Sequence, residues 1–142
     1  MTHDPERVSE VRAWIVKAVE DLRAAEVLLK LEEPLNGVAL FHAQQAAEKA
    51  MKGFLCWHDQ PLKKTHNLIP LGKSCVQIDA SLEAFLRPAA KMTDYAWQYR
   101  YPGEPAEPEI EEALEAVSIA RVVIKAVLDR LPSDIAIGIS LT

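Results

Sequence analysis

Apolar residues recur every three to four positions along most of the chain, which is the period of an amphipathic α-helix. Prolines and glycines gather where this pattern stops, so these interruptions mark loops between helices. The periodic segments predict four long helices and one short one, at about residues 4–31, 36–58, 67–78, 79–99 and 108–131. Helices of this kind joined by short loops predict an all-α, antiparallel, up-and-down helical bundle.

Capping residues and prolines mark where the helices begin and end. Asp4 precedes a proline and is typical of a helix start, and Asn36 is a favourable N-cap for the second helix. Thr65 or Asn67 can cap the short third helix. Pro88 lies inside the apolar pattern of the fourth helix, so it predicts either a kink or a break there.

The end of the chain follows a different pattern. Residues 132–142 alternate apolar and polar side chains as a strand would, but no second strand is evident to pair with them. We therefore expect residues 1–131 to form a single helical domain. Residues 132–142 should form an extended C-terminal tail that lies either on the domain surface or on a partner.

Composition narrows the class of protein. The chain has 142 residues, of which 49% are apolar and 26% charged, as in soluble globular domains. Its net charge of −5 argues against non-specific nucleic-acid binding over a wide surface, but a local basic site remains compatible with it. Neither a signal sequence nor a membrane span is evident, so we expect a cytoplasmic protein. Cys56 and Cys75 are interpreted as small buried hydrophobes.

The second predicted helix differs from an ordinary core helix because polar residues lie among small alanines in its middle. Such side chains need partners from a neighbouring helix, a second subunit or a ligand. We interpret Gln45, Glu48 and Lys49 as a polar seam at a dimer interface. Two alternatives stay open: a simple ion pair between Glu48 and Lys52 one turn apart, or a groove shared with Arg100.

Three segments together resemble the HEPN domain family. They are FHAQQAAEKAMKGFL in the second helix, KKTHNL after it, and QYRYPG in the proline-rich loop. The similarity runs from about Trp14 to Leu131. The resemblance implies the same helical architecture. For stand-alone members it also implies a homodimer that partners a small nucleotidyltransferase in a toxin–antitoxin-like system.

The loop after the fourth helix carries the first candidate site. An arginine such as Arg100, held by a proline-rich turn, can bind phosphate or carboxylate through two hydrogen bonds. The rings of Tyr95 and Tyr101 can stack on a base beside it. The alternative is that Arg100 pairs with an acid such as Glu48 and the tyrosines fill the end of the bundle. RYP is characteristic of the family, which adds weight to the ligand-binding hypothesis.

The basic loop before the third helix carries the second candidate site. Lys63, Lys64 and His66 can form a small anion site beside the start of that helix, for a nucleotide or RNA. The alternative is a solvated loop in which His66 caps the helix or bonds to the backbone.

One departure from the family limits the functional prediction. HEPN ribonucleases carry an arginine followed, after about four to six residues, by a histidine, and two subunits bring these motifs together to cleave RNA without a metal. No arginine of this chain has a histidine at that distance. The sequence thus predicts a HEPN-like binding module with no assigned catalytic residue. The alternative is a toxin-type ribonuclease built from Arg100 and His66 across a dimer. No metal-ligand spacing or phosphate loop is present, so we predict no metal and no cofactor.

Overall fold

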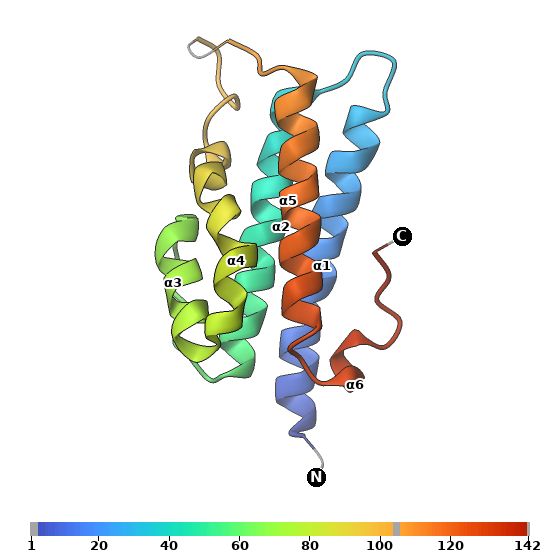
Figure 1. Cartoon of the computed structure of the whole chain (residues 1–142). Helices are drawn as coiled ribbons and strands as arrows, with labels where there is room; N and C mark the ends of the chain where they lie inside the picture. The colour runs from blue at the N-terminus through green and yellow to red at the C-terminus, as the bar shows by residue number, and fades with distance from the viewer. Residues whose placement is uncertain (1–2, 104–105, 142) are drawn as a thin grey trace.

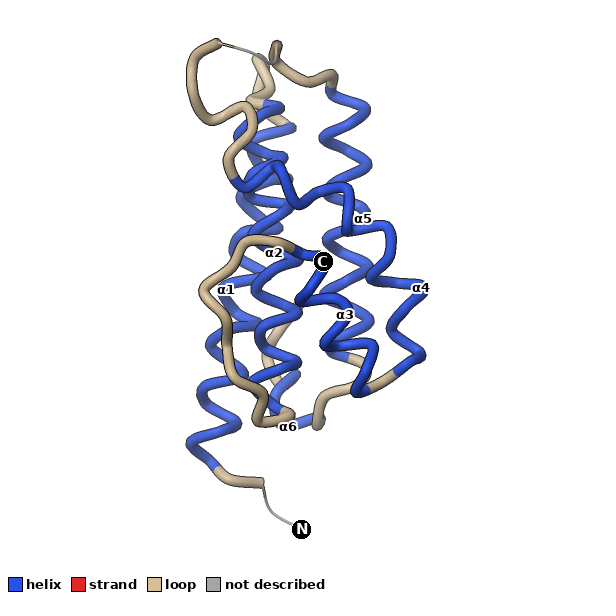
Figure 2. The backbone as a smooth tube through the Cα atoms, turned by 90° about the vertical axis from the view of Figure 1, so that its left-hand side faces the viewer, coloured by secondary structure: helices blue, strands red, loops and turns tan. Residues whose placement is uncertain are grey.

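The computed structural model describes residues 3–103 and 106–141. In these residues every regular element is helical and no strand is present. Three long helices run side by side through the molecule (Figure 1), namely α1 (Pro5–Leu29), α2 (Asn36–Trp57) and α5 (Ile110–Leu128). The view turned by 90° likewise contains only helices and loops in the described part of the chain (Figure 2). The prediction of an all-α bundle is confirmed.

Helix α2 contacts α1, α3, α5 and the 3-10 segment η2 (Arg87–Ala96). Small side chains allow neighbouring helices to approach it closely. Gly53 shows how close this approach is, because an added Cβ would lie 2.9 Å from Cδ1 of Ile15 on α1. The alanines on the inner faces of α2 have no exposed surface, and they are Ala39, Ala43, Ala46, Ala47 and Ala50.

Shorter helices cover one flank of the bundle (Figure 1). α3 (Leu68–Ile78) is capped by Asn67, whose side chain accepts a hydrogen bond from the backbone N–H of Ile69 at 3.0 Å. Of the two residues predicted to cap this helix, Asn67 is the one that does so. α3 is followed by the 3-10 segment η1 (Ala80–Leu82) and α4 (Glu83–Leu86).

The predicted fourth long helix is broken into η1, α4 and η2. The break falls where the sequence placed it, because Pro88 lies at the start of η2. Proline has no N–H to donate, and its ring clashes with the carbonyl four residues earlier, so an α-helix cannot continue unchanged through it. Of the two alternatives, a break is observed.

The start of α2 is closed by the loop before α5. Asn36 is the first helical residue, and its Nδ2 donates to the carbonyl of Pro108 at 3.1 Å. The N–H of Gly37 donates to Oε1 of Glu107 at 2.7 Å. The prediction that Asn36 is the N-cap is therefore wrong. Leu35 occupies that position, and a carboxylate from a distant loop satisfies a free N–H group of the helix.

The tail folds back onto the bundle. It begins with the short helix α6 (Ser133–Ala136), which packs against α1. Ile135 has no exposed surface, and its carbonyl accepts a hydrogen bond from Nη1 of Arg12 at 2.7 Å. The prediction of an extended tail is wrong for residues 133–136, because burial of Ile135 favours a helical turn there. Ile139 and Leu141 also pack against the core, and contact of the tail with a partner stays a prediction.

Parts of two predicted segments lie outside the described residues: 104–105 in the proline-rich loop and 142 in the tail. The division of the chain into residues 1–131 and a tail stays a prediction. In the described ranges, none of the helices combines the length and the apolar character that crossing a bilayer requires.

Candidate functional site

A carboxylate lies buried in the middle of α2. Glu48 is only 3% exposed. Its Oε2 accepts a hydrogen bond from Nζ of Lys52 at 3.0 Å, and its Oε1 contacts Nδ1 of His66 at 2.9 Å. The side-chain amides of Gln44 and Gln45 also donate to Oε1, at 3.2 and 3.4 Å. We call these five residues the Glu48 cluster.

Helical spacing assembles most of the Glu48 cluster. Gln44, Glu48 and Lys52 are four residues apart, so their side chains lie one above another on the same face. A buried ion pair is tolerated only when its remaining hydrogen-bonding capacity is used. The glutamines supply these bonds, and Nε2 of Gln45 also donates to Oε1 of Gln44 at 2.8 Å. Nζ of Lys52 further lies 5.9 Å from the ring centroid of Trp14, a cation–π contact.

His66 reaches this cluster from the loop before α3. Its backbone carbonyl accepts a hydrogen bond from Nε2 of Gln44 at 2.9 Å, which fixes the backbone beside the imidazole. Because an ionised carboxylate can only accept, Nδ1 of His66 carries the proton in its contact with Glu48. The His66 side chain is 69% exposed. Most of this side chain is therefore open to solvent.

Arg100 lies against α2 near the helix start. The carbon of its guanidinium group is 4.2 Å from the ring centroid of Phe41, and Nη1 donates to the carbonyl of Ala96 at 3.1 Å. Tyr99 has a φ of 63°, in the left-handed region that residues other than glycine rarely adopt. Arg100 follows this residue directly and contacts Phe41 on α2.

The alternative in which Arg100 pairs with Glu48 is not observed, because His66 and Lys52 already hold that carboxylate. Within the described residues, Arg100 forms no ion pair with any acid. Tyr101 is 71% exposed, with its ring centroid 5.9 Å from the guanidinium carbon. Donors for a phosphate and a ring for a base are thus both present at the surface.

Arg100 and His66 lie along the same face of α2. Their contacts on that helix, Phe41 and Glu48, are seven residues apart, which is close to two full turns. Phe41 and Glu48 are therefore about 10 Å apart along the helix axis. A ligand that spans two turns of α2 can therefore contact both side chains.

The predicted lysines of the basic loop are not part of this arrangement. Lys63 and Lys64 are both exposed. Lys63 lines a separate small depression of about 150 Å³, together with Pro61 and Pro70. No contact joins either lysine to His66 or Arg100 in the described part of the chain. Their role in binding an anion stays a prediction.

Lys49 belongs to a second polar contact, between α2 and α1. Its Nζ donates to Oδ2 of Asp21 at 2.6 Å, and Nδ1 of His42 contacts Oδ1 of the same carboxylate at 2.8 Å. The predicted seam of Gln45, Glu48 and Lys49 is thus divided between two networks inside one chain. Its role at a dimer interface stays a prediction.

Tyr95 lies in the interior of the domain. Its hydroxyl donates to Oε1 of Glu112 on α5 at 2.6 Å, and only 7% of the residue is exposed. Burial and this hydrogen bond raise the pKa of the Tyr95 phenol. The ring centroid of Tyr99 is 6.2 Å away. For Tyr95 and Tyr99 these contacts match the alternative that the tyrosines fill the end of the bundle, whereas Tyr101 is exposed. A ligand contact by Tyr95 stays a prediction.

Sequence reasoning missed three residues that shape the site. They are Phe41, whose ring contacts the Arg100 guanidinium; Gln44, which donates hydrogen bonds to Glu48 and to the His66 carbonyl; and Asp21, which binds His42 and Lys49. Spacing could have found the first two, because they lie seven and four residues before Glu48 on one helical face. Asp21 has no comparable signal, since its partners are on another helix.

Neither cysteine takes part in the site. Cys56 and Cys75 are buried and free. Burial raises the pKa of the Cys56 thiol to about 11 and that of the Cys75 thiol to about 12, so both are poor nucleophiles. The interpretation as buried hydrophobes is confirmed. Among the residues that the structure describes, no group of three His, Cys, Asp or Glu side chains could hold a metal ion.

Comparison with known families agrees with this architecture. A model of the HEPN domain family matches residues 11–131, which is most of the chain. The chain belongs to the HEPN domain family. The matched range includes the Glu48 cluster, Phe41 and Arg100, so the whole candidate site lies inside the HEPN domain. No curated protein and no solved structure gives a significant match.

Proposed function

We propose that this HEPN protein is a homodimeric binding module that docks with a separate nucleotidyltransferase chain. It holds a nucleotide or an RNA phosphate on the face of α2 between Arg100 and His66. The observation that carries the ligand part of the proposal is the Arg100 guanidinium, stacked on Phe41 and without a carboxylate partner in the described residues. The missing arginine–histidine motif favours binding over catalysis.

The setting of Arg100 supports recognition of a phosphate. One nitrogen is held by the Ala96 carbonyl and the guanidinium lies against the Phe41 ring, so its orientation is set before a ligand arrives. A pre-organised planar fork loses less conformational entropy for each hydrogen bond it forms. The exposed Tyr101 ring can stack on a base, and His66 supplies a polar group about two turns further along.

Thermal unfolding with AMP, ATP or a short single-stranded RNA as probe tests the ligand site. A probe present at 100 times its Kd adds about 2.7 kcal/mol of stability and raises Tm by roughly 5–10 °C. Arg100→Ala should abolish this shift, and Arg100→Lys should reduce it because a lysine cannot form the planar fork. Arg87→Ala, at an exposed arginine paired with Glu83, should keep it. Absence of a shift with every probe at millimolar concentration would overturn the ligand proposal.

Native mass spectrometry of protein purified gently from its own cells tests the assembly. We expect the mass of two chains, alone or with a further chain that peptide sequencing identifies as a nucleotidyltransferase. A strict monomer by light scattering, together with no such chain recovered, would overturn the assembly proposal. The ligand proposal would be unaffected.

A second candidate, metal-independent ribonuclease activity across a dimer, is favoured by one observation. The exposed imidazole of His66 is oriented by a buried carboxylate, as in general acid–base catalysis. The purified protein should then cut transfer RNA in EDTA, and both His66→Ala and Arg100→Ala should stop it. Lys17→Ala, at an exposed lysine paired with Glu20, serves as a surface control. Cleavage that survives both substitutions would indicate a contaminant.

A further inference from the structure

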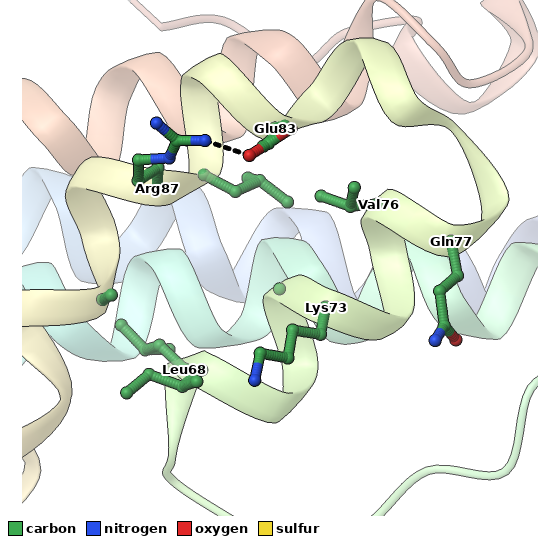
Figure 3. A pocket seen from close by; sticks show the side chains of 10 residues that line it. Leu68, Lys73, Val76, Gln77, Glu83 and Arg87 are labelled. Carbon is green, nitrogen blue, oxygen red and sulfur yellow. Dashed lines mark hydrogen bonds and ion pairs between the residues drawn. The ribbon is translucent and has the colours of Figure 1, made fainter.

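An open groove runs between α3 and the wall formed by α4 and the start of η2. Its volume is about 400 Å³, which lies within the range of about 300–1,000 Å³ seen for small-molecule sites. Figure 3 shows Lys73 and Gln77 on α3 and the Glu83–Arg87 ion pair on the opposite wall. Most of the remaining lining is apolar, formed by Leu68, Ile69, Gly72, Val76, Leu86 and Ala90.

Gly72 helps to keep this groove open. Glycine inside a helix is destabilising relative to alanine, so its presence within α3 needs a reason. At Gly37 and Gly53 the reason is packing, since an added Cβ would come within 3.0 Å of a neighbouring side chain. At Gly72 an added Cβ would meet only Cβ of Leu86, at 4.0 Å. No close contact of the fold requires glycine there, and any larger side chain would occupy the groove.

The edges of the groove carry positive charge in a protein whose net charge is −5. Lys73 is exposed, and in the part of the chain that the structure describes no carboxylate pairs with it. On the opposite wall, Arg87 is bonded to Glu83 one turn earlier. Among the described residues, Lys73 is therefore a cation without an acidic partner beside an apolar surface.

We propose that this groove binds a small amphiphilic anion, an apolar chain that ends in a carboxylate. The chain lies over Gly72 between Val76 and Leu86, and the carboxylate meets Lys73. Apolar walls with a few polar groups that orient the ligand are typical of small-molecule sites. A charge-assisted hydrogen bond from an ammonium to a carboxylate is stronger than a neutral one, so it selects the anion.

Isothermal titration calorimetry with decanoate tests the proposal, at concentrations below those at which decanoate forms micelles. Decanol serves as an uncharged probe of the same length. We expect saturable 1:1 binding of decanoate, and weaker binding of decanol. Lys73→Gln should weaken decanoate about tenfold, the loss expected for one charge-assisted contact, and leave decanol unchanged. Lys91→Gln, at an exposed lysine paired with Glu115, is the matched control and should change neither.

Substitution of Gly72 tests the position of the apolar chain. Gly72→Leu places a side chain in the groove and should abolish binding of both probes. Gly72→Ala should bind more weakly than the unmodified protein while unfolding at a higher temperature, since alanine favours the helix. Weaker binding by a variant that unfolds at a higher temperature would show that the site is impaired while the fold is kept.

Three results would overturn the proposal. The first is no saturable binding of decanoate, and the second is unchanged binding by folded Gly72→Leu. The third is equal binding of decanol and decanoate with no effect of Lys73→Gln, which would remove the role of the anionic group. If the first result is accompanied by binding to anionic phospholipid vesicles, the groove binds a lipid surface instead of a free amphiphile.

Discussion

His66 and Glu48 form one hydrogen bond whose two ends lie in different environments. Nδ1 of His66 is 2.9 Å from Oε1 of Glu48, yet the histidine side chain is 69% exposed and the glutamate side chain only 4%. The carboxylate also carries the charge that balances Lys52, whose side chain is 9% exposed. Substitution of Glu48 should therefore cost more stability than substitution of His66, although both remove the same hydrogen bond.

We expect Glu48→Gln to lower the free energy of unfolding by about 3–5 kcal/mol, because Lys52 would remain buried without its counter-charge. His66→Ala should lower it by no more than about 1 kcal/mol, since Glu48 keeps its other donors. Urea denaturation measures both. Glu83→Gln is the control, because its exposed ion pair with Arg87 should be worth less than about 0.5 kcal/mol. Equal losses at Glu48 and His66 would contradict the asymmetry.

Gly53 and Gly72 should respond with opposite signs to the same substitution. Gly53→Ala would place a Cβ 2.9 Å from Cδ1 of Ile15 and 3.2 Å from Cβ of Trp14, so we expect a net loss of about 1–2 kcal/mol. Gly72→Ala makes only an ordinary van der Waals contact, with Cβ of Leu86 at 4.0 Å, and should add about 0.5–1 kcal/mol through helix propensity. Thermal and urea unfolding of the two variants give the comparison. A gain at Gly53 would show that α1 and α2 pack less closely than described.

Stability should fall in mildly acidic solution because of His58. Burial lowers the pKa of its imidazole from the ordinary value of 6.5, and the charge of Asp79 opposes this shift more weakly. The folded state therefore prefers the neutral imidazole. This contribution is fully present above pH 6.5 and is lost as the pH falls toward the lower pKa of the folded state. His58→Gln should flatten the dependence of the unfolding free energy on pH over this interval, and an unchanged slope would contradict the assignment.

Tyr95 should resist ionisation in alkaline solution. Burial and its bond to Glu112 raise the pKa of its phenol above the ordinary value of 10. The stability contributed by the neutral phenol is complete below pH 10 and is lost as the pH rises toward the folded-state pKa. Phenolate absorbance followed through an alkaline titration should show a late-ionising tyrosine that Tyr95→Phe removes. Burial also raises the pKa of Tyr99, so its signal should be assigned with Tyr99→Phe.

Local features of the fold could be read from single stretches of sequence. Asn67 caps α3 as its position predicts, and Pro88 ends the α-helical pattern of the fourth segment. Asn36 has equal capping ability in sequence but does not use it, because Glu107 reaches the start of α2 from another loop. The alternating pattern of the tail predicted extension, yet burial of Ile135 against α1 favours a short helix. Both errors arise where a distant segment replaces a local preference.

The sequence by itself determined the helical period, the central role of residues 36–58 and the alignment of Gln44, Glu48 and Lys52 on one face. These follow from backbone geometry, in which residues four apart become neighbours without help from the rest of the chain. Only the tertiary structure decided that His66 completes the hydrogen bonding of Glu48, that Arg100 lies on Phe41, and that Lys49 faces Asp21 instead. These contacts depend on how each helix is rotated and how each loop closes, which packing over the whole domain decides.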